Sequence, residues 1–132
     1  MNDKFNGNGP QPFSIKARLK SFTFAWNGLK ILVKEEHNAK IHCAAAIVAI
    51  LVGIVLNFED WEWVAIAFAI AMVISAEALN SAIERICDKI QPNRDEVIKA
   101  VKDLTAGAVF VCAIAAALVG IIIVTRHILL LL

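Results

Sequence analysis

The segment SAEALNSAIERICDKI, residues 75–90, places acidic and amide side chains inside one of the most apolar parts of the chain. On a helix that turns about 100° per residue, its four acidic and amide positions fall within an arc of about 80°. These positions hold Glu77, Asn80, Glu84 and Asp88. We therefore expect one helix with a polar stripe that extends roughly 16 Å from Glu77 to Asp88.

The rest of the chain is apolar enough to place this helix in a membrane. Of 132 residues, 59% are hydrophobic and 19% are charged, with a mean hydropathy of +0.69, which is too apolar for a soluble domain of this size. A membrane-spanning helix needs roughly 20 mostly apolar residues. The stretches that qualify are 41–58, 64–83 with an extension to about residue 90, and 105–124. The sequence predicts an all-α membrane protein with three transmembrane helices.

The distribution of charge predicts the orientation of these spans. Seven Lys or Arg residues precede the first span and five lie between the second and third, whereas the loop NFEDWEW, residues 57–63, has none. By the positive-inside rule, the N-terminus and the second loop are expected in the cytoplasm of a multi-pass protein of the cell's inner membrane. The acidic first loop would then face outward, with Trp61 and Trp63 as interface anchors. The balanced net charge of +1 argues against a nucleic-acid partner.

Residues 1–13 are rich in Gly, Asn and Pro, and we expect a disordered tail followed by a single domain, residues 14–132. Within residues 14–34 the apolar side chains recur at steps of three and four, which predicts an amphipathic helix. Its basic polar face suits the cytoplasmic headgroup layer of the membrane, although packing against a partner helix would use the same pattern. The apolar positions are Ile15, Leu19, Phe22, Trp26, Leu29 and Val33.

The acidic stripe has two interpretations. Glu77 and Asn80 could simply join helices through hydrogen bonds. Three acids on one stripe repel each other, however, and a cation such as Mg²⁺ would relieve that repulsion. Short connections should bring further charged groups to the same side, namely Glu35, Glu36, Lys102 and Asp103. Carboxylates for Mg²⁺ and a lysine for phosphate suit phosphoryl transfer, although the chain has no Walker glycine loop or protein-kinase signature.

The segment EALNSAIERICD, residues 77–88, resembles the signature of the small prokaryotic diacylglycerol kinases, integral membrane enzymes that include undecaprenol kinases; Cys87 stands where Val is usual. WNGLK, EEHNAKIH and KDLTAGAV follow the family's order and approximate spacing, starting at residues 26, 35 and 102. The resemblance implies a homotrimer of three-span subunits with surface helices and active sites shared between subunits. It also implies Mg²⁺ and ATP as phosphate donor, with diacylglycerol or undecaprenol as the lipid acceptor.

The resemblance further implies a role for each matching residue. Glu77 would be the general base that takes the lipid hydroxyl proton, and Asn80 would orient the reacting groups. Glu36 and Glu84 would hold the Mg²⁺ bound to ATP, with Asp88 as support. The implied nucleotide contacts are Lys102, Asp103, Arg18, Phe24, Asn93, Arg94 and Asp95, and the implied lipid contacts besides Glu77 are Trp26 and Ala106.

Two segments depart from the family's pattern. Ala17 stands where an Arg is usual, with Arg18 next to it, and the segment QPNRDEVIK that begins at residue 91 differs in composition. A non-catalytic membrane protein, in which the stripe only binds an ion or joins helices, is the alternative of another class.

Overall fold

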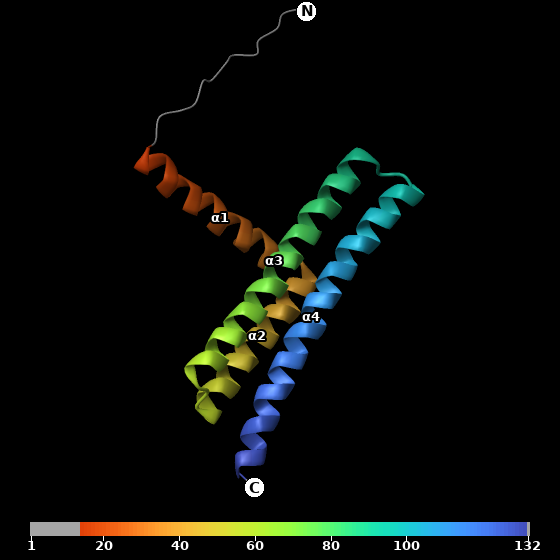
Figure 1. Ribbon diagram of the computed structural model, residues 1–132. Helices are drawn as coiled ribbons and strands as arrows, with labels where there is room; N and C mark the ends of the chain where they lie inside the picture. Colours follow the sequence, from red (N-terminus) through yellow and green to blue (C-terminus); the bar gives the residue numbers. More distant parts are fainter. Residues whose placement is uncertain (1–13, 132) are drawn as a thin grey trace, which may run out of the picture.

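The computed structural model describes residues 14–131, and all regular secondary structure in that range is α-helical (Figure 1). The tail predicted at residues 1–13 lies outside this range. The helices are α1 (Ile15–Glu35), α2 (His37–Leu56), α3 (Asp60–Ile90) and α4 (Glu96–Leu131). The last three are long and apolar enough to cross a membrane. The prediction of an all-α protein with three membrane-crossing helices is therefore confirmed.

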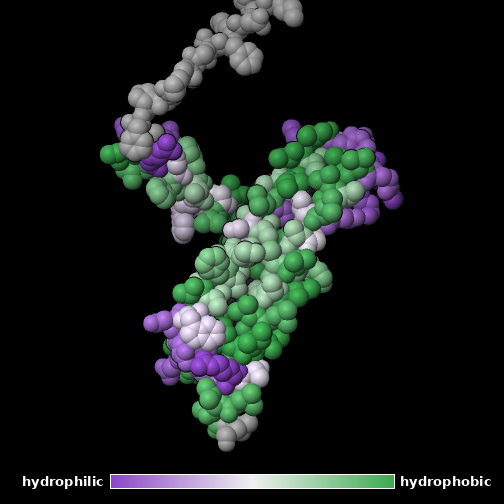
Figure 2. All heavy atoms as spheres, in the orientation of Figure 1, coloured by the Kyte–Doolittle hydropathy of each residue, from purple (hydrophilic) through white to green (hydrophobic). Residues whose placement is uncertain are grey.

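The longest helices, α3 and α4, form an antiparallel pair, α2 packs beside α3, and α1 leaves the bundle at an angle (Figure 1). Helix α3 ends at Ile90, where its predicted extension ends, and α4 begins before its predicted span, so their connected ends project past the start of α2. Figure 2 shows an apolar surface between hydrophilic zones at the two ends of the bundle. Large apolar side chains face outward along all three long helices, as expected for helices surrounded by lipid rather than water.

The first corner of the fold lies at Glu36, between α1 and α2. Its backbone is extended, with φ −93° and ψ 125°, and its amide donates to the Leu32 carbonyl at 3.0 Å. On α1 Leu32 is buried, whereas the other side chains that the structure describes on this helix are exposed. The location of α1 on a membrane surface stays a prediction.

The turn between α2 and α3 is a helix-ending motif followed by a capping box. Asn57 adopts the left-handed conformation, which Asn tolerates better than most residues, and the Phe58 amide donates to the Gly53 carbonyl at 3.0 Å. Glu59 then caps α3, and its own amide donates to the Glu62 carboxylate at 2.8 Å. Three residues are therefore enough to reverse the chain.

An ion cluster ties α3 to α4 next to this turn. Glu62 has no exposed surface and accepts from Arg126 at 2.7 Å, with the His127 ring nitrogen 2.9 Å away. Arg126 also donates to Glu59 at 2.8 Å. The hydrogen bonds from Arg126 and from the Trp61 indole lower the pKa of Glu59 below its ordinary value. A buried carboxylate is tolerated here because each of its oxygens has a polar partner.

The structure corrects the prediction for this turn in one respect. Glu62, expected in a loop, is buried in the first turn of α3. Trp63 is partly buried and packs against Phe58 with ring centroids 5.7 Å apart, whereas Trp61 is exposed, and the place of both at a membrane interface stays a prediction. The reason for both observations is that α3 already begins at Asp60, and residues two apart on a helix point about 200° apart. The two indoles therefore cannot face the same way.

Gly53→Ala is expected to destabilise the bundle because a Cβ at this position would lie 2.7 Å from the Trp63 ring and 2.8 Å from the Phe58 ring. The midpoint of thermal unfolding in detergent should fall by several degrees. Gly107→Ala is the matched control, since a Cβ there has open space and alanine favours a helix. Equal midpoints for the two variants would contradict this packing.

Arg126→Met should also lower the unfolding midpoint, because it leaves the buried Glu62 carboxylate without its cation. The double variant Glu62→Met with Arg126→Met should be more stable than the single variant, since no uncompensated charge remains buried. Arg94→Met removes an exposed pair with Glu96 at 3.5 Å and serves as the control. If Arg126→Met had the same unfolding midpoint as Arg94→Met, the ion cluster would not contribute to the stability of the bundle.

Candidate active site

The buried acid Glu77 lies at the beginning of the predicted stripe on α3. It is 2% exposed, and its Oε2 atom has no hydrogen-bond partner among residues 14–131. The charged or titratable groups that act on it electrostatically are His42, Glu36 and Glu84. A buried polar atom without a partner costs roughly 1 to 3 kcal/mol, so such atoms mark places where function outweighs stability.

Asn80 and Glu84 form the next part of the same face. Asn80 is 6% exposed, and its amide nitrogen donates to Glu84 Oε1 at 3.2 Å, whereas its Oδ1 atom is unpaired within the described chain. Ser81, for which no role was predicted, is 5% exposed, and its hydroxyl also has no hydrogen-bond partner within residues 14–131. Three neighbouring polar side chains of one helix face thus each retain an unused hydrogen-bonding atom in the protein interior.

Glu36 is brought close to this face by Arg85. The Arg85 guanidinium donates to Glu36 Oε1 at 2.7 Å and contacts Glu35 Oε2 at 3.0 Å. Arg85 thereby fastens the corner between α1 and α2 to α3. From the sequence, Arg85 was counted only as one of the positive charges that predict the orientation of the spans. Its place eight residues after Glu77 and the adjacent acids Glu35 and Glu36 could have suggested this ion pair.

The predicted nucleotide contacts on α4 are engaged in ion pairs. Lys102 is half-buried and donates to Asp88 on α3. Asp103, one position further, points elsewhere and accepts from Lys99 at 2.6 Å. The structure therefore connects Lys102 with the acidic stripe and leaves Asp103 on an exposed surface of α4.

Asp95, a predicted nucleotide contact in the loop between α3 and α4, has a structural role. The Asp95 carboxylate accepts from the amides of Val97 and Ile98 at 2.9 and 3.0 Å, which caps the first turn of α4. Arg94 and Asn93 are exposed. The carboxylate of Asp95 is thus already used by the backbone.

The remaining predicted contacts lie outside the buried face. Arg18, Phe24 and Trp26 are exposed on α1, and Ala106 is exposed on α4. Lys20 lies 5.7 Å from the Phe24 ring centroid, and Lys30 lies 5.8 Å from that of Trp26. Helix α1 leaves the bundle, and its three side chains are exposed rather than part of the buried face of α3 (Figure 1).

The residues present fit a nucleotide-bound Mg²⁺ better than a closed metal site. Within the described part of the chain, no three His, Cys, Asp or Glu side chains gather as a metal-binding group. Magnesium in phosphoryl-transfer sites, however, needs only one or two carboxylates, because phosphates and water supply the other oxygens. Glu36 and Glu84 both act electrostatically on Glu77 and can supply them.

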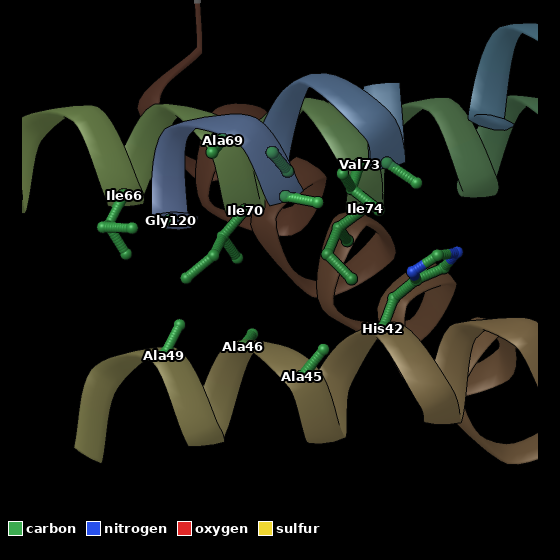
Figure 3. Close-up of a pocket in the computed structure, with 13 residues that line it drawn as sticks. His42, Ala45, Ala46, Ala49, Ile66, Ala69, Ile70, Val73, Ile74 and Gly120 are labelled. Carbon is green, nitrogen blue, oxygen red and sulfur yellow. The ribbon is translucent and has the colours of Figure 1, made fainter. Parts of the chain in front are cut away.

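An apolar cavity of about 270 Å³ lies between α2, α3 and α4 (Figure 3). Small side chains such as Ala45, Ala46 and Gly120 leave this space open, and His42 stands at one end of it. His42 also acts electrostatically on Glu77, so one residue is shared between the lining of the cavity and the surroundings of the buried acid.

Taken together, these features define a class: an all-α membrane protein with buried acidic, amide and hydroxyl side chains along one face of a helix inside the bundle. Residues 23–124 match the family model described as prokaryotic diacylglycerol kinase. The chain belongs to this family, and the resemblance found in the sequence is confirmed.

Individual relatives agree with this membership. The undecaprenol kinase of Bacillus subtilis is 36% identical over 104 residues, which cover 79% of this chain and 85% of that protein. A diacylglycerol kinase of Synechocystis is 33% identical over 77% of this chain and 59% of its own length. The diacylglycerol kinase of Escherichia coli K12 is 26% identical over 83% of this chain and 89% of its own.

Proposed function

We propose that the chain is an ATP-dependent lipid kinase that transfers the γ-phosphate of Mg-ATP to the hydroxyl group of a membrane lipid. The observation that carries this proposal is the unpaired carboxylate of Glu77, buried beside Asn80 and Glu84 in a member of this kinase family. The non-catalytic alternative does not account for three unused polar atoms on one buried face.

In the proposed reaction, the acceptor hydroxyl gives its proton to Glu77 Oε2. The acceptor oxygen forms a bond to the γ-phosphorus while the bond from that phosphorus to the β–γ bridging oxygen breaks, releasing ADP. A general base must lie within hydrogen-bond reach of the proton it takes, and a carboxylate oxygen without another partner is free to do so. Asn80 would orient the reacting groups, as the resemblance implies.

The charge of the nucleotide is the second requirement. Mg²⁺ would neutralise the phosphates, with Glu36 and Glu84 as its protein ligands. Lys102 is the basic group nearest the stripe, and Asp88 holds it in place through their ion pair. The further nucleotide contacts that the resemblance implies are Asp103, Arg18, Phe24, Asn93, Arg94 and Asp95, and the further lipid contacts are Trp26 and Ala106.

The acceptor is proposed to be diacylglycerol, which would give phosphatidic acid. Undecaprenol is the second candidate, and the 36% identity to an undecaprenol kinase is the observation that supports it. Both acceptors are primary alcohols on apolar chains, which suits the apolar cavity beside the polar face. Purified protein in detergent, given Mg-ATP and each lipid in turn, should release ADP with one of them; release with neither would favour the non-catalytic alternative.

We also propose the setting that the resemblance and the charge pattern imply. The protein would be a homotrimer in the cytoplasmic membrane, with α1 on the inner surface. The N-terminus and the α3–α4 loop would face the cytoplasm, where ATP is available.

Glu77→Gln should lower lipid-dependent turnover by about 100-fold or more, because general-base catalysis typically contributes about 10²- to 10⁴-fold. The amide has the size of the carboxylate but does not accept the proton. Asp60→Asn, the same change at an exposed acid on α3, should leave turnover within about twofold. Unchanged ADP release in the Gln variant would disprove the base assignment.

Glu84→Gln should raise the Mg²⁺ concentration needed for half-maximal turnover by several-fold, because a neutral amide is a weaker ligand for Mg²⁺ than a carboxylate. The KM for the lipid should change much less. Titrations of metal and of lipid in the same micelles separate the two effects, with Asp60→Asn again as control. Equal changes in both parameters would count against a metal role.

A further inference from the structure

Ser81 has a buried hydroxyl that the proposed reaction does not yet use. A serine inside a helix commonly donates back to the carbonyl four residues earlier, but the Ser81 hydroxyl makes no hydrogen bond within residues 14–131. The residue is 5% exposed, so bulk water does not satisfy it. A hydrogen-bond donor in this position is available to a ligand.

The position of Ser81 on α3 places this donor on the α2 side of Glu77. Ile74, seven residues earlier on the same helix face, lines the cavity next to His42 of α2 (Figure 3). Arg85, four residues later, donates to Glu36 at the start of α2. Ser81 lies between these two contacts, where the apolar cavity approaches the acid.

Asn80 and Glu84 belong to the other side of the face. The Asn80 amide nitrogen already donates to Glu84, and both Glu84 and Asp88 act on Lys102 of α4. Glu77 is thus flanked by two different environments, the charged groups next to α4 and, toward α2, the end of the apolar cavity at His42, with the Arg85–Glu36 pair one turn beyond Ser81. Phosphates require the first environment, and a lipid alcohol suits the second.

We propose that the Ser81 hydroxyl donates a hydrogen bond to the oxygen of the lipid alcohol that is phosphorylated, and so positions it against Glu77. This inference rests on the proposed lipid kinase function. Side chains four residues apart on a helix have Cβ atoms about 5 to 6 Å apart, so one oxygen can lie within hydrogen-bond distance of both groups. The alcohol proton points to Glu77, one lone pair accepts from Ser81, and the other lone pair is directed at the γ-phosphorus.

This arrangement requires the acceptor only to be an alcohol, so it applies to diacylglycerol and to undecaprenol. Ser81 transfers no proton and forms no covalent bond in the reaction. Its effect is to fix the direction of the attacking lone pair, and misdirection of a reacting atom is costly in phosphoryl transfer.

Ser81→Ala tests the proposal, because alanine removes the hydroxyl and favours the helix. In micelles with saturating Mg-ATP, kcat/KM for the lipid alcohol should fall about three- to tenfold, the effect of one neutral hydrogen bond. The KM for Mg-ATP and the slow hydrolysis of ATP without lipid should stay within about twofold. Ser81→Thr, which keeps the hydroxyl, should recover most of the lipid kcat/KM.

Ser75→Ala, the same change at an exposed serine on α3, is the matched control, and thermal unfolding of all variants verifies their folding. An unchanged lipid kcat/KM in Ser81→Ala would overturn the role of Ser81 alone. An equal loss in the lipid, Mg-ATP and unfolding measurements, with no recovery by Ser81→Thr, would make Ser81 a packing residue. No alcohol-dependent turnover in the unaltered chain would overturn the kinase function and this proposal together.

Discussion

The two ion clusters that join α3 to α4 set the geometry on which the site depends. Glu62 meets Arg126 near one end of the pair, and Asp88 meets Lys102 near the other. At about 1.5 Å per residue, the joined positions are roughly 39 Å apart on α3 and roughly 36 Å apart on α4. The two lengths agree, and both exceed a hydrocarbon core of about 30 Å. The charges can therefore lie at the membrane surfaces, while the residues between them are mostly apolar apart from the stripe, Arg85 on α3 and Asp103 on α4.

Glu77 lies inside this interval, roughly 16 Å along α3 from Asp88. A carboxylate at that depth is expensive in lipid, and it is tolerated only because α3 turns it toward the bundle interior. The same burial removes competing water from Glu77, Asn80 and Ser81. Their unpaired atoms contrast with Glu62, which is equally buried but fully engaged. One end of α3 thus uses a buried acid for stability, and the middle keeps a buried acid available for chemistry.

The length of the apolar stretches predicted the spans, and helical periodicity predicted the stripe from Glu77 to Asp88, because a long helix leaves little choice of which side chains align. Contacts between helices were not predictable in this way. In the sequence Arg85 looks like a charge at the membrane surface, and only the structure shows that it donates a hydrogen bond to Glu36. Ser81 looks like one of the small side chains that pack between helices. The burial of Glu62 was not predictable because the beginning of α3 at Asp60 depends on a three-residue turn, which is closed by backbone carbonyls of α2 and capped by the side chains of Glu59 and Glu62. The roles of Glu36, Asn80 and Glu84 still rest on family resemblance.

Glu36 belongs both to the candidate site and to the corner between α1 and α2. It stands at the corner where α1 leaves the bundle, and its carboxylate accepts from Arg85 on α3. In the proposed site, a cation held by Glu36 would compete with Arg85 for the same oxygen, since a carboxylate shared by two positive partners binds each of them less strongly. Glu35 offers Arg85 a second acceptor at 3.0 Å, so the corner could stay attached to α3 while Glu36 binds the cation. Two adjacent acids at this corner would therefore allow one to stabilise the fold while the other takes part in the proposed site.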